Sequence, residues 1–303
     1  MEVFFPSSGV QTQLWLPPLV ALVISFFTSM AGVSGAFLLL PFQMSVLGFT
    51  SPAVSPTNLV FNILAIPAGV WRYVRERRML WPLALIMLVG TVPGVVAGGF
   101  VRLALLPDAR GFKLFVGCVL LYLGLRLVAD LVRRDPEPER PPSKPSQSEW
   151  NTRVVHWRLS SLSYEFRGKR YQCSPLSLAL ACLLIGGVGG VYGVGGGAII
   201  VPYVVGVLRL PVHTIAGATL LSTLGTSVVG VLFYQLVAPW YAGAGQPVAP
   251  DWLLGGLFGL GGMAGIYLGA RAQRHMRPTW LKALLGLLIL YVSVRYIGGY
   301  FWS

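Results

Sequence analysis

The sequence predicts an all-α polytopic membrane protein made of two homologous halves, and three observations support this fold class. The first is composition: 55% of the 303 residues are hydrophobic and 11% are charged, whereas a soluble domain carries roughly 25% charged residues. The second is that the apolar residues are gathered in long blocks, and the third is that these blocks repeat. The mean hydropathy of +0.70 agrees with membrane insertion.

Eight apolar blocks are long enough to be membrane segments, which need about 20 residues as a helix. They show no alternation of apolar and polar residues, and lipid cannot satisfy free backbone groups, so we expect helices. The blocks are Leu14–Leu47, Pro52–Val74, Leu80–Leu106, Phe112–Val132, Pro175–Leu208, Val212–Val237, Trp252–Ala270 and Trp280–Ile297.

The second set of blocks repeats the first. Gly32–Pro41 matches Gly193–Pro202, and after a short insertion Trp81 matches Trp252. Similar matches occur along every block, which predicts two homologous halves of four hydrophobic helical segments each. Further pairs are Tyr73 with Tyr234, Gly90, Gly94 and Gly98 with Gly261, Gly265 and Gly269, and Lys113 with Lys282.

The basic residues indicate how the halves are oriented. If all eight blocks crossed the membrane, the basic segment Arg271–Lys282 would lie outside, against the preference of Lys and Arg for cytoplasmic loops. If the first block of each half enters and returns on one side, each half crosses three times and the repeats are inverted. We therefore expect six crossings, two broken, re-entrant first segments and both termini outside, although a broken helix that crosses fully would leave a similar pattern. The basic residues then left outside are Arg102, Arg110, Lys113 and Arg295.

The stretch between the halves has a different composition. Asp135–Gln147 is rich in proline and charge, which is typical of an extended tether. Arg153–Leu159 and Ser163–Gln172 alternate polar with aromatic or β-branched residues, which predicts a small cytoplasmic β-hairpin or three-stranded patch. The expected domains are membrane repeat 1 at 14–132, this linker at 133–174 and membrane repeat 2 at 175–298. We expect the linker to be a connector, with regulation as the alternative.

No catalytic constellation is visible. The three histidines are scattered, the three cysteines lack ligand spacing, and the acidic residues avoid the interiors of the apolar blocks. The 23 Lys and Arg give a net charge of +13, but they lie almost entirely between the blocks, so orientation in the membrane explains them better than nucleic-acid binding. The sequence predicts no catalytic site, metal or cofactor, and favours a transporter over a membrane-embedded enzyme or scaffold.

Each half carries a Gly-rich break in its first block, at Gly32–Gly35 and Gly193–Gly197. Glycine permits positive φ, so one half-helix can end there and another can begin. The N-terminus of a half-helix exposes free N–H groups and a partial charge of about +0.5. Two such ends from inverted halves would hold an anion near mid-membrane without a buried Lys or Arg.

Neutral side chains around the breaks are the expected hydrogen-bond donors. Asn58 matches Thr219 between the halves, and Asn62 matches Thr223. Asparagine is costly in lipid, so Asn58 and Asn62 are expected to face a polar interior; Thr226 is a further polar neighbour. The candidate substrate-binding residues are Ser34, Gly35, Gln43, Thr57, Asn58, Asn62, Gly195, Gly196, Gly197, Thr219, Ser222 and Thr223. By contrast, the series Gly90/Gly94/Gly98 and its repeat are expected to pack helices.

These motifs make the sequence similar to the sulfite exporter TauE/SafE family, also called the toluene sulfonate uptake permease family. The resemblance covers nearly the whole chain and rests on the Gly-rich motifs ending in Pro41 and Pro202, on Ala216–Thr219 and on the aromatic-rich linker. The first motif has Ser34 and Ala36 where the second has glycine, so the two half-sites need not be equivalent. The resemblance implies transport of sulfur-containing anions: sulfite, sulfoacetate or related organosulfonates.

The sequence therefore predicts a multi-pass carrier in the cell inner (plasma) membrane that works by alternating access. Its expected partners are a small anionic solute and the lipid bilayer; a homo-oligomer is compatible with the sequence. The alternative within transport is a carrier of another small solute, such as a carboxylate or a sulfur-containing amino acid. Direction, coupling ion and exact substrate are left open.

Overall fold

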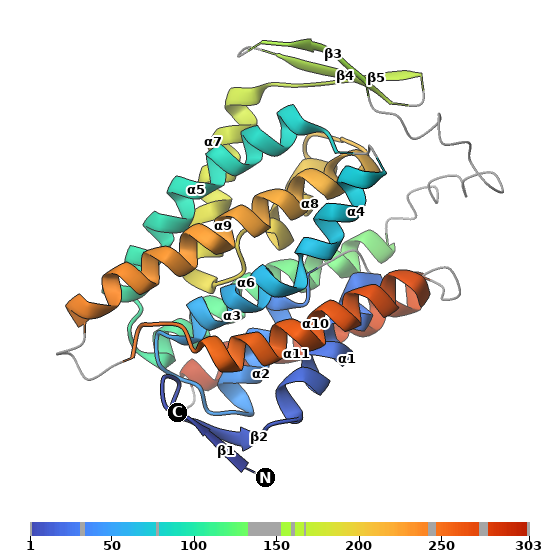
Figure 1. Ribbon diagram of the computed structural model, residues 1–303. Coiled ribbons are helices and arrows are strands. Elements are labelled where there is room, and N and C mark those ends of the chain that lie inside the picture. The colour runs from blue at the N-terminus through green and yellow to red at the C-terminus, as the bar shows by residue number, and fades with distance from the viewer. Residues whose placement is uncertain are drawn as a thin grey trace.

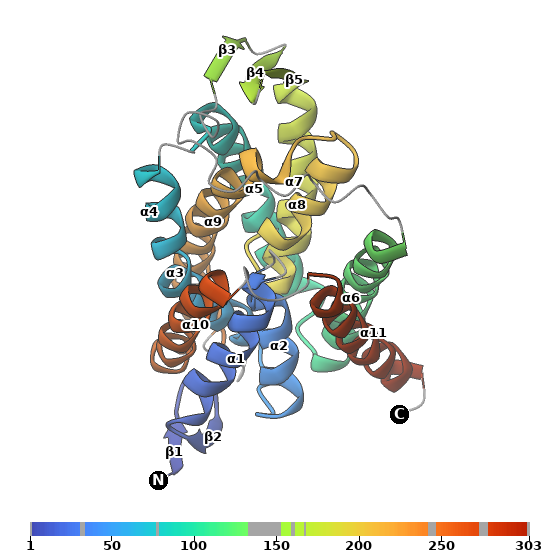
Figure 2. The same ribbon diagram turned by 90° about the vertical axis from the view of Figure 1, so that its right-hand side faces the viewer.

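The computed structural model describes residues 2–30, 34–76, 79–132, 153–158, 161–166, 168–241, 247–272 and 278–301. A body of helices lies between two small antiparallel sheets (Figure 1). The two-stranded sheet and both chain ends lie at one end of the body, and the three-stranded sheet lies at the other end (Figure 2). We call these the terminal end and the sheet end.

A hairpin that the sequence did not predict begins the chain. Strands β1 (Glu2–Phe5) and β2 (Val10–Gln13) pair through Phe5 and Val10, whose side chains are buried. The hydroxyl of Ser8 donates to Oδ2 of Asp251, 2.8 Å away, which fixes the hairpin to the start of helix α10. Four-residue strands carry too little alternation to be recognised from sequence.

The linker strands are present as predicted. β3 (Arg153–Trp157), β4 (Leu162–Phe166) and β5 (Lys169–Cys173) form an antiparallel sheet in that order. Tyr164 is buried and its hydroxyl hydrogen bonds to that of Thr214, at 2.9 Å, so the sheet is held against the start of helix α9. The tether expected at Asp135–Gln147 lies outside the described residues.

The first block of each half is broken into two helices, as predicted. These are α1 (Leu16–Met30) and α2 (Ala36–Ser45), and α7 (Pro175–Tyr192) and α8 (Gly197–Gly206). Leu178 at the start of α7 and Leu210 just after α8 belong to one buried cluster with residues of the three-stranded sheet. Helix α8 therefore returns to the sheet end, where α7 began, whereas α1 and α2 begin and end toward the terminal end (Figure 2).

The second block is also divided, which the sequence did not predict. Helix α3 (Val54–Ala65) is followed by α4 (Pro67–Arg75). Proline at the first position of α4 has no N–H to donate to the preceding turn and crowds its carbonyl, so the helix is interrupted there. The counterpart in the second half, α9 (Val212–Tyr241), is continuous.

Four further helices complete the body: α5 (Trp81–Ala104), α6 (Ala109–Val132), α10 (Trp252–Ala272) and α11 (Pro278–Phe301). Six described stretches are long and apolar enough to cross a membrane, so the chain is a multi-pass membrane protein. Helix α7 is among them by length and composition, although α8 brings the chain back to the end where α7 starts. The stretches are Val54–Arg75, Trp81–Ala104, Ala109–Ala129, Pro175–Tyr192, Thr214–Tyr241 and Trp252–Gly269.

The halves are held together by helix pairs in which each half contributes one helix; we call these the exchanged pairs. Helix α7 packs along α5, and the equivalent pair is α1 along α10; α6 packs along its own counterpart, α11. The repeated glycines make these contacts, as predicted. A side chain at Gly94 would overlap the backbone of α7 at Leu183 and Gly187, and one at Gly261 would overlap the backbone of α1 at Pro18. Glycine therefore allows backbone-to-backbone contact between the halves.

We predict that Gly94→Ala lowers the stability of the protein by about 1–3 kcal/mol, because the added methyl group forces α5 away from α7. The check is the melting temperature of the detergent-purified protein. Gly187→Ala is the matched control on the same interface, because its Cβ would meet its nearest atom at an ordinary 3.8 Å. Equal melting temperatures for the two variants would contradict this account of the packing.

Candidate functional site

The two broken segments meet at Asn58, a fully buried side chain of α3. Its Nδ2 donates to the carbonyl of Ala36 at the start of α2, at 3.0 Å, and to the carbonyl of Gly193 after α7, at 2.9 Å. Gln43 in turn donates through Nε2 to Oδ1 of Asn58, at 3.4 Å. One amide thus joins the break of the first half to that of the second, and both of its N–H groups are in use.

Two more hydrogen bonds tie the second break to the first half. The hydroxyl of Tyr192 donates to the carbonyl of Phe37 in α2, at 2.7 Å, and the hydroxyl of Ser55 donates to the carbonyl of Val191, at 3.3 Å. Tyr192 was not among the expected site residues. The matching position in the first half is Ala31, so the repeat gave no hint of its role.

Three successive carbonyls of the second break, those of Gly193, Val194 and Gly195, accept hydrogen bonds from side chains. Besides the bond from Asn58 to Gly193, Asn62 donates to the carbonyl of Val194 at 3.1 Å, and Thr226 donates to the carbonyl of Gly195 at 2.9 Å. A buried carbonyl without a partner costs free energy comparable to a lost hydrogen bond. The expected donors therefore hold the unwound backbone in this conformation, rather than facing an open solute site.

Glycine is required where the second break turns. Gly193 has φ +81° and ends α7, and a Cβ there would lie 2.5 Å from the carbonyl oxygen of Ser55. Gly196 has φ +78° and precedes the first residue of α8. Side chains are strained at such angles, so the sequence Gly193–Gly196 permits a sharp reversal that leads into α8.

The helices that follow the breaks begin without side-chain caps. The N-cap residue is Gly35 for α2 and Gly196 for α8, and neither N-cap position makes a side-chain hydrogen bond to the helix. The backbone nitrogen of Ala36, the first residue of α2, donates a long hydrogen bond of 3.4 Å to Oγ of Ser34. The free N–H groups and the partial positive charge of a helix N-terminus are the elements of an anion site.

The remaining predicted residues divide into two groups. Thr223 lies against Gly195 and Gly197, and Ser222 hydrogen bonds to Thr91 of α5 at 2.9 Å, so these positions are near the second break. Two others have different roles. Thr57 accepts from the backbone nitrogen of Asp251 at the start of α10, and Thr219 bonds only to the backbone of its own helix. Gly32 of the first break lies outside the described residues.

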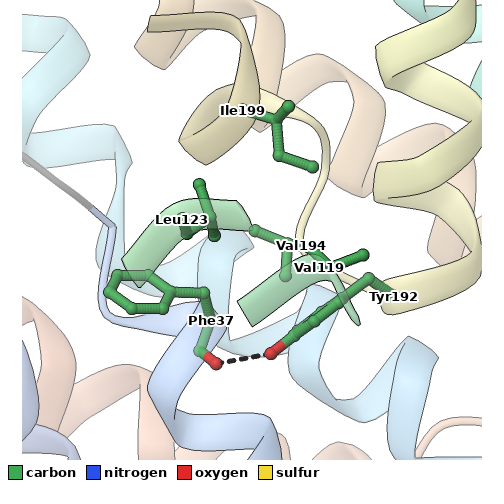
Figure 3. Close-up of a pocket in the computed structure, with 6 residues that line it drawn as sticks. All are labelled: Phe37, Val119, Leu123, Tyr192, Val194 and Ile199. Atoms are coloured by element: carbon green, nitrogen blue, oxygen red, sulfur yellow. Dashed lines mark hydrogen bonds between the residues drawn. The ribbon is translucent and has the colours of Figure 1, made fainter. Parts of the chain in front are cut away.

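A narrow space lies beside this junction, between α6 and the broken segments. It is apolar and too small for a solute, with the Tyr192–Phe37 hydrogen bond along one side (Figure 3). Among the residues that the structure describes, this space leaves no room for a solute beside the junction. Its lining residues are Phe37, Val119, Leu123, Tyr192, Val194 and Ile199.

These features define the class of protein. It is a polytopic helical membrane protein with two discontinuous helices that meet in its interior, and discontinuous helices are the usual building elements of solute sites in transporters. Among the described residues, no group of three or more His, Cys, Asp or Glu side chains could hold a metal ion.

The chain belongs to the sulfite exporter TauE/SafE family, which matches residues 18–296. It is therefore a membrane transporter and not an enzyme, as the motifs predicted. Two proteins of Xylella fastidiosa, from strains Temecula1 and 9a5c, are each 23% identical over 281 residues and 91% of both chains, and each is described as a probable membrane transporter protein. No solved structure matches the chain.

We predict that Asn58→Leu destabilises the protein, because it leaves the carbonyl of Gly193 buried without its side-chain donor and removes the second bond to the carbonyl of Ala36. The orphaned carbonyl of Gly193 is expected to cost roughly 1–3 kcal/mol. The melting temperature in detergent measures the effect. Thr219→Val is the matched control, since Thr219 occupies the equivalent position and loses only bonds to its own helix. If both variants melt alike, Asn58 does not hold the breaks together.

Proposed function

We propose that this protein is a secondary transporter of a small sulfur-containing anion, such as sulfite, sulfoacetate or another organosulfonate, in the cell inner (plasma) membrane. The observation that carries the proposal is the convergence of the two breaks through Asn58, at the uncapped starts of α2 and α8. Membership of the TauE/SafE family supports the sulfur-containing anion as the substrate class.

The physical basis is the partial positive charge at the two helix starts. An anion can accept hydrogen bonds from their free N–H groups without a full positive charge beside it. Neutral donors hold it loosely enough to be released on the other side. The side chains that meet the breaks, Gln43, Asn58, Asn62 and Thr226, are uncharged. A carboxylate, which would repel an anion, is not among them.

Transport requires the junction between the two breaks to open. Both N–H groups of Asn58 are engaged by backbone carbonyls in this conformation, so an anion enters only when the two breaks separate. The rigid glycine contacts of α5 with α7 and of α1 with α10 favour movement of these pairs as units. In the proposed cycle, the breaks separate toward one membrane face at a time, and the anion takes the place of their mutual contacts.

Inverted halves make the two access routes equivalent. We propose that α1–α2 and α7–α8 are re-entrant hairpins from opposite faces, with the terminal end outside and the three-stranded sheet in the cytoplasm. The exchanged packing of α7 with α5 and of α1 with α10 supports a two-fold relation between the halves, since it is unchanged when the halves are interchanged. The opposite positions of the two hairpins in the helical body support it as well (Figure 2).

The transport function is tested with purified protein in liposomes. We expect uptake of sulfite or sulfoacetate that exceeds uptake of acetate, and a rise in melting temperature with the same anions. Gly197→Ala should lower the flux at least about tenfold, because its methyl group would overlap Thr223 at the first residue of α8. Gly256→Ala, whose Cβ would meet its nearest atom at 3.9 Å, should transport normally. If none of the four anions sulfite, sulfoacetate, thiosulfate and sulfate is taken up or raises the melting temperature, the proposal is contradicted.

The topology is tested with single cysteines in a background in which the three native cysteines are alanine. We predict that Ser7→Cys, in the exposed turn of the terminal hairpin, reacts with a membrane-impermeant maleimide in intact cells. Lys169→Cys, exposed in the three-stranded sheet, should react only after the membrane is permeabilised. Reaction of both cysteines from the same side would rule out the inverted arrangement.

A further inference from the structure

Arg102 is a completely buried arginine in the last turn of α5. Its Nη1 donates to the carbonyl of Leu106, and its guanidinium carbon lies 3.8 Å from the centre of the Phe112 ring. Its other two nitrogens, Nε and Nη2, have no hydrogen-bond partner among the residues that the structure describes. The positive charge is thus buried, and two of the three guanidinium nitrogens make no hydrogen bond to a described residue.

No described carboxylate neutralises this charge by direct pairing. Asp108 acts on it electrostatically from a distance, but Oδ2 of Asp108 accepts from the backbone nitrogen of Gly111 at the start of α6, at 2.7 Å. Burying an ion without a partner costs several kcal/mol. The carbonyl of Leu106 and the ring of Phe112 offset only part of this cost, so the site lacks an anionic partner.

The unused nitrogens define the shape of that partner. Nε–H and the Nη2 group lie along the same edge of the planar guanidinium, and this edge binds two oxygens of one oxyanion side by side. Tyr234 of α9, also fully buried, is near enough to Arg102 for electrostatic interaction. The arrangement suits a carboxylate, sulfite or sulfonate group better than a monoatomic anion.

We propose that Arg102 forms a second oxyanion-binding site, on the route between the helix breaks and the terminal end of the protein. This inference rests on the proposed anion transport and adds a specific contact to it. As the anion passes, two of its oxygens would accept hydrogen bonds from Nε and Nη2. Arg102 then selects oxyanions by geometry, whereas the helix starts select them by partial charge.

The site belongs to one route only. In the register that matches Trp81 with Trp252, the residue of the second half equivalent to Arg102 is Gln273. Glutamine carries no charge and cannot form the same fork. The two otherwise equivalent routes therefore differ in their affinity for oxyanions, and capture at low concentration is favoured from the terminal end.

The test compares Arg102→Met with Arg102→Lys, which keeps the charge but loses the fork. Sodium sulfite and sodium sulfoacetate are the probes, with flux into liposomes and melting temperature as readouts. For Arg102→Met we expect an unchanged or higher melting temperature without anion, because the unpaired buried charge is gone. We also expect loss of the anion-induced rise and at least a tenfold higher KM for entry from the terminal side. Arg102→Lys should show an intermediate KM.

Arg110→Gln is the matched control, since it removes an exposed arginine of the neighbouring helix α6 and should leave KM unchanged. If both Arg102 variants keep the KM of the unsubstituted protein, the inference is overturned while the transport function stands. If the unsubstituted protein neither transports nor is stabilised by either probe, both this inference and the proposed function fail. If Arg102→Met does not fold, the KM of Arg102→Lys decides: a raised value supports the fork, and an unchanged value rejects it.

Discussion

The need to satisfy backbone carbonyls inside a membrane governs this structure. A helix broken in the hydrocarbon interior exposes carbonyl groups that water cannot reach, so the protein itself must supply their partners. For the second break these partners are Asn58, Asn62 and Thr226, of which the two asparagines belong to the opposite half. The second half therefore needs the first to hold its broken helix, and the unwound backbone of the second break becomes a point at which the halves meet.

The same constraint relates stability to transport. The hydrogen bonds that join the two breaks are made between uncharged groups. Each contributes only about 0.5–1.5 kcal/mol net to stability. A bound anion can compete with bonds of this strength. The glycine ridges, by contrast, bring backbones into direct contact along whole helices and keep each exchanged pair rigid. The protein thus combines strong contacts within each helix pair and weak contacts at the junction of the two breaks, as the proposed transport cycle requires.

Much of this architecture follows from the sequence, because hydropathy and internal repetition are visible in the sequence without knowledge of the fold. They predicted the membrane helices, the broken first blocks and the buried position of Asn58 and Asn62. They did not predict what the asparagines bind, since the partner carbonyl of Gly193 lies 135 residues away from Asn58 in the chain. Arg102 was assigned to the outer ends of the helices by charge alone, and its burial depends on Phe112 folding over it.

In the proposed site, an oxyanion binds between the starts of α2 and α8. The most direct measurement is the anomalous diffraction of crystals grown with 2-bromoethanesulfonate, whose bromine marks the position of the ligand. We expect a bromine peak inside the helical body, with the sulfonate oxygens within hydrogen-bonding distance of the first N–H groups of α8 and near Asn58. A bromine peak confined to the protein surface, with the Asn58 and Tyr192 hydrogen bonds kept as they are here, would rule out this site.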